Sequence, residues 1–299
     1  MNYICHAAKA RILIFFVLCS VVLYSQPEKY VIGVRRGPGF FACLFDTLSH
    51  LVIAEQQRKI PVVYWGKNSL YFEPGGYNGV LNAWEYYFEP VSPARYARSD
   101  VIHDEHVDSI KSIGGVFAYY CNNKTGKTIA RYQVNKIMQK YIRVKSHITQ
   151  QVITFYKKYL MGRKTVGIHL RGTDKHIECI NTPPAEILAF ANKMYKNHQF
   201  FIATDEEALL ELAKKTLNGP VIYFDSFRSR DGRPVHFYSD NKAKVGEEVL
   251  IEALLLARCN IFLHTCSSVS TAVLCINPAL DNISFPSKFI KSLSKLPKI

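Results

Sequence analysis

The feature that most constrains this fold is a regular alternation of short apolar runs and longer amphipathic runs between residues 165 and 276. Short apolar runs bounded by polar residues are typical of buried strands, and the amphipathic runs between them have helical spacing. Strands that alternate with helices form a parallel sheet covered on both faces. We therefore predict a doubly wound α/β unit with strands at 165–170, 200–205, 220–224 and 261–264 and helices at 183–197, 206–217, 244–259 and 267–276.

A second α/β unit is predicted nearer the N-terminus. An apolar run at 29–34, a glycine loop, an amphipathic run at 41–59 and a strand at 60–65 form a βαβ opening. Residues 68–96, rich in proline, glycine and aromatic side chains, predict an ordered excursion. Apolar residues at helical spacing from 134 to 160 predict one long bridging helix, or two joined end to end. The predicted fold is α/β, with two Rossmann-like doubly wound domains that face each other across a cleft.

The predicted division is 1–26 as a short hydrophobic segment, 27–160 as the first domain with its bridging helix, and 161–299 as the second domain. The apolar run Ile12–Tyr24 follows basic residues and is shorter than a comfortable membrane span, as in the core of a signal peptide. Only Ser25 offers a small residue for cleavage, so a cleaved signal peptide and a short uncleaved anchor both stay open. We expect a secretory route or membrane association: the Golgi or ER lumen in a eukaryote, the inner membrane in a bacterium.

The formal net charge of +14 favours an anionic partner, although charge alone does not choose between a nucleotide, a nucleic acid, a membrane surface and an acidic glycan. No nucleic-acid-binding motif is recognisable, and we expect no nucleic acid to bind. Cysteine and histidine spacing does not indicate zinc. The stretch from His103 to Asp108 could supply ligands, but it is more typical of an exposed loop or helix start, and we expect no metal. Four cysteines in apolar runs are predicted to lie in the core: Cys43, Cys259, Cys266 and Cys275.

Polar side chains follow three of the predicted strands. Arg171 and Asp205 come at the ends of two strands, and Thr265, Ser267 and Ser268 follow a third. In open parallel sheets, ligands bind outside the carboxyl ends of the strands. A return of the chain to water explains one such strand end, but three with these residue types favour a binding site.

The cationic part of this candidate site is Arg171. An arginine binds a diphosphate through paired hydrogen bonds in a geometry that lysine cannot copy, and Lys175 would add a point charge. The alternative is a surface ion pair between Arg171 and Asp174 or Glu178, which stabilises little. His169 either orients the site or is a hydrogen-bonded core histidine.

Two helix starts add candidate anion-binding groups. The three hydroxyl residues after residue 264 open a helix whose free N–H groups favour phosphate, but the same residues also serve as N-caps without a ligand. Gly37 and Gly39 permit close approach of the backbone to a ligand, in a loop that matches neither the P-loop nor the dinucleotide fingerprint. Glu252 lies within an apolar helix, where a buried carboxylate needs a partner: N–H groups of a guanine edge, or a salt bridge to Arg258 or another domain.

Four stretches of the sequence carry a family resemblance. "HLRGTDK" at 169–175 resembles the first motif of the fucosyltransferase superfamily, which includes core α1,6-, nodulation and protein O-fucosyltransferases. "FFIATDEEALLELAKK" at 200–215 and "LIEALLLARCNIFLHTCSSVSTAV" at 250–273 are similar to its second and third motifs. "GVRRGPGFFACLFDTL" at 33–48 is similar to the glycine loop near the start of its N-terminal domain.

The resemblance implies a GT-B-like pair of Rossmann domains and an inverting, metal-independent transfer of fucose from GDP-fucose to a glycan or glycoconjugate hydroxyl. GDP-fucose is then a substrate, and no cofactor is implied. Carried over, Arg171 holds the diphosphate and stabilises the departing GDP, Glu252 contacts the nucleoside, Ser268 lies near the phosphates, and Glu178 is the base for the acceptor hydroxyl.

The sequence departs from the family pattern in two places. Many relatives have a second arginine directly after the first, where this chain has Gly172, so Arg171 works with less help or Lys175 compensates. The step from Lys175 to Glu178 is also one residue shorter than in the core α1,6 enzymes. The missing arginine favours a second hypothesis, a GDP-sugar- or glycan-binding module of the same fold that transfers no sugar.

Overall fold

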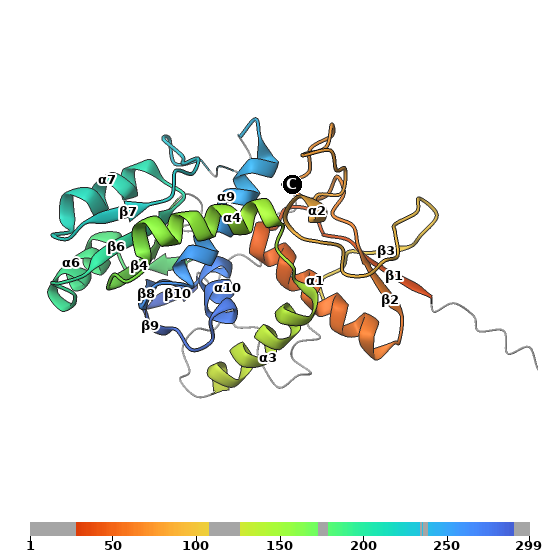
Figure 1. Cartoon of the computed structure of the whole chain (residues 1–299), viewed down its shortest axis with the longest axis horizontal. Coiled ribbons are helices and arrows are strands. Elements are labelled where there is room, and N and C mark those ends of the chain that lie inside the picture. The colour runs from red at the N-terminus through yellow and green to blue at the C-terminus, as the bar shows by residue number, and fades with distance from the viewer. Residues whose placement is uncertain (1–27, 108–125, 173–178, 234, 236–238, 290–299) are drawn as a thin grey trace, which may run out of the picture.

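The computed structural model describes residues 28–107, 126–172, 179–233, 235 and 239–289. It is an α/β protein with a three-stranded parallel sheet near one end and a five-stranded parallel sheet near the other (Figure 1). The hydrophobic segment predicted at 1–26 lies outside the described residues. Within the described ranges, no helix is long and apolar enough to cross a membrane.

The smaller sheet has the strand order β2-β1-β3, with β1 (Lys29–Ile32), β2 (Ile60–Val63) and β3 (Ile102–His103). Helix α1 (Phe40–Gln56) connects β1 to β2, which confirms the predicted βαβ opening. Strand β3 was not predicted, and it ends at His103, the first residue of the stretch expected to be a loop or helix start. It has only two residues, too few to show an alternating pattern in the sequence, and it forms by pairing with β1.

The larger sheet has the order β7-β6-β4-β8-β9, and all of its strands are parallel. The predicted strands and helices between residues 165 and 276 are all present. Strand β9 and an antiparallel pair of short strands, β5 with β10, were not expected. The elements are β4 (Thr165–Leu170), β5 (Cys179–Asn181), α6 (Pro184–Met194), β6 (Gln199–Thr204), α7 (Glu207–Thr216), β7 (Val221–Tyr223), α9 (Lys242–Leu256), β8 (Ile261–His264), α10 (Ser268–Ile276), β9 (Asp281–Ser284) and β10 (Ser287–Phe289).

The larger sheet is covered on both faces, as predicted. Residues of β4 alternate between the two faces of the sheet: Val166 and Ile168 pack in the apolar cluster that includes α6 and α7, while Gly167 faces Leu256 and Cys259 at the end of α9. A Cβ added at Gly167 would lie 3.0 Å from Cys259 Sγ, so glycine permits this close approach of helix and sheet. The four cysteines predicted to be in the core are buried.

The run predicted as a bridging helix is two helices, α3 (Gly126–Tyr141) and α4 (Ser146–Phe155), and α4 continues as a π-helical turn at Tyr156–Leu160. The break between them pairs with the chain that follows the short helix α2 (Trp84–Tyr87). The Lys145 N–H donates to Tyr87 O at 2.8 Å, and the Glu89 N–H donates to Arg143 O at 2.8 Å. These long-range bonds replace helical ones, which is why the helix stops.

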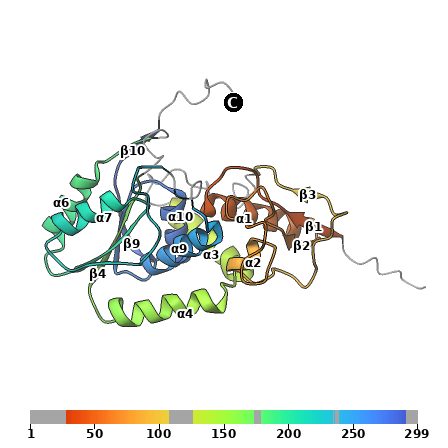
Figure 2. The ribbon, with the colours of Figure 1, turned by 90° about the horizontal axis from the view of Figure 1, so that it is seen from above.

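Helices α9 and α10 lie between the two sheets in both views (Figures 1 and 2), and they contact α2 and α1 respectively. The carboxylate of Glu247, on α9, is the polar centre of this junction. It accepts hydrogen bonds from Lys244 Nζ at 2.6 Å, Gln151 Nε2 at 2.9 Å and Tyr77 Oη at 3.0 Å, and it lies 3.3 Å from His147 Nε2. One buried carboxylate therefore joins three separate segments of the chain.

We expect Glu247→Ala to lower the free energy of unfolding by about 3 kcal/mol, because it removes a buried charge that satisfies several donors. Urea unfolding followed by circular dichroism measures the change. Glu211→Ala is the matched control, because Glu211 pairs with Lys214 on the surface, where an ion pair contributes little to stability. Equal effects of the two substitutions would contradict the role given to Glu247.

Candidate functional site

A cleft of about 440 Å³ opens where the carboxyl ends of β4 and β6 meet the loop after β1 and the starts of α1 and α10. Its walls therefore come from both sheets. Eight of the residues predicted from the sequence line it: His169, Arg171, Asp205, Glu252, Ser267, Ser268, Gly37 and Gly39. The structure brings these positions together, although they span more than two hundred residues of sequence.

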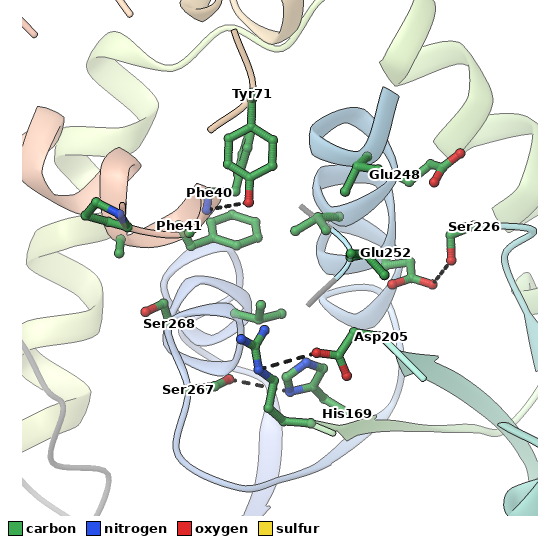
Figure 3. A pocket seen from close by; sticks show the side chains of 18 of the residues that line it. Phe40, Phe41, Tyr71, His169, Asp205, Ser226, Glu248, Glu252, Ser267 and Ser268 are labelled. Atoms are coloured by element: carbon green, nitrogen blue, oxygen red, sulfur yellow. Dashed lines mark hydrogen bonds and ion pairs between the residues drawn. The ribbon is translucent and has the colours of Figure 1, made fainter. Parts of the chain in front are cut away.

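Arg171 forms an ion pair with Asp205 at the cleft wall. The Arg171 Nε atom lies 3.5 Å from Asp205 Oδ2, and the Gly172 N–H donates to Asp205 Oδ1 at 2.9 Å. The two side chains are 25% and 17% exposed, so this ion pair is half-buried at the cleft wall. Figure 3 shows Asp205 beside His169 at the end of the larger sheet. The alternative partners of Arg171, Asp174 and Glu178, lie outside the described residues, as does Lys175.

The side chain of Glu206 fills the space beside the position after Arg171. A Cβ added at Gly172 would lie 2.4 Å from the carboxylate of Glu206. The arginine that many relatives have here would displace the end of the Glu206 side chain.

The start of α10 is both capped and part of the cleft. The Ser267 Oγ atom accepts the Ser270 N–H at 3.0 Å, which confirms the N-cap interpretation for Ser267. His169 Nδ1 lies 3.2 Å from Ser270 Oγ and 3.5 Å from Ser267 Oγ, so this histidine is buried and hydrogen-bonded as well as cleft-lining. Thr265 is 3% exposed and is not among the residues that line the cleft, so the structure does not place it with the other hydroxyls.

The start of α1 forms the facing wall. Gly37 has a φ of +104°, in the region that favours glycine, and Gly39 is the N-cap without a side-chain cap. Tyr71 supplies the missing acceptor, because the Phe40 N–H donates to its hydroxyl at 2.9 Å (Figure 3). Two helix N-termini thus border one cleft, and the dipole of each favours an anion there.

Glu252 is 9% exposed and faces the cleft from α9. It accepts a hydrogen bond from Ser226 Oγ at 2.7 Å (Figure 3) and one from Arg228 Nη2 at 3.3 Å. Burial raises the pKa of Glu252 to about 7, against the opposing charge of Arg228. Arg258, the partner considered from the sequence, instead donates to Leu254 O at 2.6 Å.

Several cleft residues were not predicted. Glu248, one turn before Glu252, accepts the Phe227 N–H at 2.8 Å, and burial raises its pKa. The spacing of two acids four residues apart in an apolar helix was a signal available in the sequence. The other unpredicted lining residues include Arg35, Arg36, Phe40, Tyr71, Ser226 and Phe227.

No group of three or more histidine, cysteine or acidic side chains suited to a metal ion occurs among the described residues. In the stretch considered for metal binding, His106 Nδ1 lies 2.8 Å from Asp46 Oδ1. The site is therefore described by its arginines, buried acids and helix starts.

The fold resembles that of the NodZ alpha-1,6-fucosyltransferase, in a crystal soaked with GDP-fucose, with a TM-score of 0.54, 16% sequence identity and coverage of 88% of this chain and 99% of that one. NodZ from Bradyrhizobium gives the same TM-score, identity and coverage. POFUT1 in complex with GDP has a TM-score of 0.48 and 13% identity, over 87% of this chain and 99% of that one. No family model matches the sequence, and no curated protein sequence matches it either. The chain thus has a GT-B-like fucosyltransferase fold.

Because the pKa of Glu252 is raised, its contribution to the free energy of unfolding should fall as pH rises through the acidic range. Folded protein keeps a proton on Glu252 up to about pH 7, whereas an unfolded glutamate loses it near pH ~4.3. The wild type therefore loses stability relative to Glu252→Gln as pH rises from about 4 to about 7, and no further above that. Urea unfolding of both proteins at several pH values measures this difference.

Glu247→Gln is the control for this slope. Burial acts to raise the pKa of Glu247, but its hydrogen bonds from Lys244 and Gln151 outweigh burial and lower it. The wild type should therefore gain stability relative to Glu247→Gln as pH rises, in the acidic range. Parallel slopes for the two variants would contradict the different environments assigned to these acids.

Proposed function

We propose that the protein is an inverting, metal-independent glycosyltransferase that transfers fucose from GDP-fucose to a hydroxyl of a glycan or glycoconjugate. One observation carries the proposal: an arginine held by a carboxylate and two helix N-termini border one cleft, in a fold that resembles a fucosyltransferase crystallised with GDP-fucose. These groups suit a diphosphate, because each favours negative charge without a metal ion.

The donor would occupy the cleft from the start of α10 to the buried acids of α9. Its diphosphate contacts Arg171 and the N-terminus of α10, where Ser268 is the first residue of the helix. Its nucleobase lies at Glu252, whose carboxylate accepts hydrogen bonds from adjacent N–H groups of guanine. This assignment requires ionised Glu252, which Arg228 and Ser226 support by donating hydrogen bonds to it.

The chemical step follows from this placement. The acceptor oxygen attacks the anomeric carbon, the bond from that carbon to the diphosphate oxygen breaks, and its electron pair leaves with GDP. Arg171 stabilises the charge that grows on this oxygen, more in the transition state than in the ground state. Glu178 takes the proton of the acceptor hydroxyl, and Lys175 adds positive charge; both remain sequence-based assignments outside the described residues.

The second candidate function is a GDP-sugar- or glycan-binding module without transfer. The contact between position 172 and Glu206 favours it, because the second arginine of many relatives cannot fit there without moving Glu206. Both functions predict nucleotide binding, and only the first predicts sugar release. We further propose that the N-terminal segment directs the protein to a membrane or into the secretory route.

Binding of GDP, UDP, ADP and CMP by calorimetry, followed by turnover of GDP-fucose with and without glycan acceptors, tests the proposal. We expect selective binding of GDP and acceptor-dependent release of GDP. Selective GDP binding without turnover would support the binding module instead. No preference for GDP would contradict both functions.

Arg171→Ala should lower the rate of transfer by about 10³-fold or more, because it removes the main charge that stabilises the leaving group. The fold should remain, since the side chain is 25% exposed and lies at the cleft wall. Initial rates with GDP-fucose and a thermal unfolding curve measure both effects. Arg163→Ala, an exposed arginine that donates to Tyr159 O, is the control, and wild-type turnover in Arg171→Ala would end this mechanism.

Glu178→Gln should fold and bind GDP like the wild type but transfer fucose about 10²–10⁴-fold more slowly, because a general base contributes that much. Single-turnover rates and GDP titrations separate the two effects. Unchanged turnover would remove Glu178 from the mechanism without affecting the role of Arg171.

A further inference from the structure

The glycine loop after β1 brings two further arginines, Arg35 and Arg36, to the cleft. Strands β1 and β3 run parallel with Ile32 opposite His103, so the residues that follow both strands leave the sheet at the same edge. Arg35 follows β1 there and lines the same cleft as Arg171. The carboxyl edge of the larger sheet therefore contributes Arg171 to the cleft, and the loop after β1 contributes Arg35 and Arg36, of which Arg35 forms an ion pair with Asp46.

A buried carboxylate fixes the position of Arg35. Asp46, in α1, is 6% exposed, and its Oδ2 accepts the Arg35 Nε–H at 2.7 Å. The other oxygen, Oδ1, lies 2.8 Å from His106 Nδ1, which follows β3. A carboxylate buried in an apolar helix is costly without partners, and both partners of Asp46 come from the loops at this sheet edge. Asp46 thus holds these loops together.

The geometry leaves the outer end of Arg35 available to a ligand. Only Nε is bonded to Asp46, and neither Nη group has a hydrogen bond to another residue in the described part of the chain. The side chain is 42% exposed. Two Nη groups with parallel N–H bonds are the arrangement that binds phosphate oxygens in a bidentate manner.

We propose that Arg35, positioned by Asp46, is the second guanidinium of the diphosphate site and takes the place of the arginine that position 172 lacks. This inference rests on the proposed function. Arg35 donates hydrogen bonds from its N–H groups to the diphosphate oxygens. It neither gains nor loses a proton when the bond from the anomeric carbon to oxygen breaks and the electron pair leaves with GDP. The anion site is then assembled from both sheets.

A substitution at Asp46 distinguishes two explanations: that Asp46 positions Arg35, or that it acts only through its negative charge. Asp46→Asn removes a negative charge near the cleft, so the overall field alone would strengthen the binding of an anion. If Asp46 acts by holding Arg35, the same substitution weakens binding, because the guanidinium loses its fixed orientation. The two explanations predict changes of opposite sign.

The test is calorimetric binding of GDP and GMP to the wild type, Arg35→Gln, Asp46→Asn and the double variant. We expect Arg35→Gln to weaken GDP binding about 10–100-fold, the effect of losing charge-assisted hydrogen bonds, and to change GMP binding much less. Asp46→Asn should weaken GDP binding about tenfold, and the double variant should bind no more weakly than Arg35→Gln alone. Asp100→Asn, which breaks the ion pair with Lys29 in the same sheet, should leave GDP binding unchanged.

Each result bears on the inference. Equal GDP affinity of the wild type and Arg35→Gln, or tighter binding by Asp46→Asn, overturns it while the proposed function stands. Failure of the wild type to bind GDP overturns the proposed function and this inference with it. Arg35→Lys covers the case in which Asp46→Asn does not fold, because it keeps the charge but loses the Nε contact. We expect it to bind GDP more weakly than the wild type, and unchanged binding would overturn the inference.

Discussion

The cleft depends on the close packing of Tyr87 against α9. A Cβ added at Gly246 would lie 2.4 Å from the Tyr87 hydroxyl, and that hydroxyl donates to Ala243 O at 3.0 Å. Only glycine permits an aromatic ring from the first half of the chain to lie this close to a helix of the second. With α9 fixed in this way, Glu248 and Glu252 face the cleft while Glu247 joins α4 and Tyr77. One helix, α9, therefore makes the contact between the two halves of the chain and also forms a wall of the cleft.

Three acids within two turns of α9 have different environments, and these set different roles. Glu247 is surrounded by donors, which lower its pKa and make it a structural anion. Burial raises the pKa of both Glu248 and Glu252, so each is costly as a bare anion and gains when a ligand brings N–H groups to it. Raised carboxylate pKa values at one end of the cleft and arginines elsewhere in it suit a ligand with a donor-rich base and an anionic linkage. A nucleoside diphosphate has both parts.

The sequence predicted the larger sheet well because its strands are apolar runs with polar ends: β4 and β8 have the predicted bounds. It did not predict β3 or β9, and it left open whether residues 134–160 form one helix or two, because these features depend on pairing with distant residues rather than on local periodicity. The same reason explains the site. Arg171, Asp205 and Ser267 follow strands and could be placed, whereas Arg228, the partner of Glu252, lies in a loop with no periodic signal. Thr265 also follows a strand, yet it is buried and does not line the cleft.

Because the site is divided between two sheets, ligand binding is coupled to the arrangement of the two sheets. Arg171 and Asp205 belong to the larger sheet, and Arg35 and Asp46 belong to the smaller sheet and its helix. An anion that contacts both arginines is favoured only in the arrangement that brings them together, so its binding free energy also stabilises that arrangement. An arginine at position 172 would place both cations on one sheet and remove this dependence. Gly172, with the Glu206 side chain beside it, therefore fits a cleft in which the smaller sheet supplies the second cation.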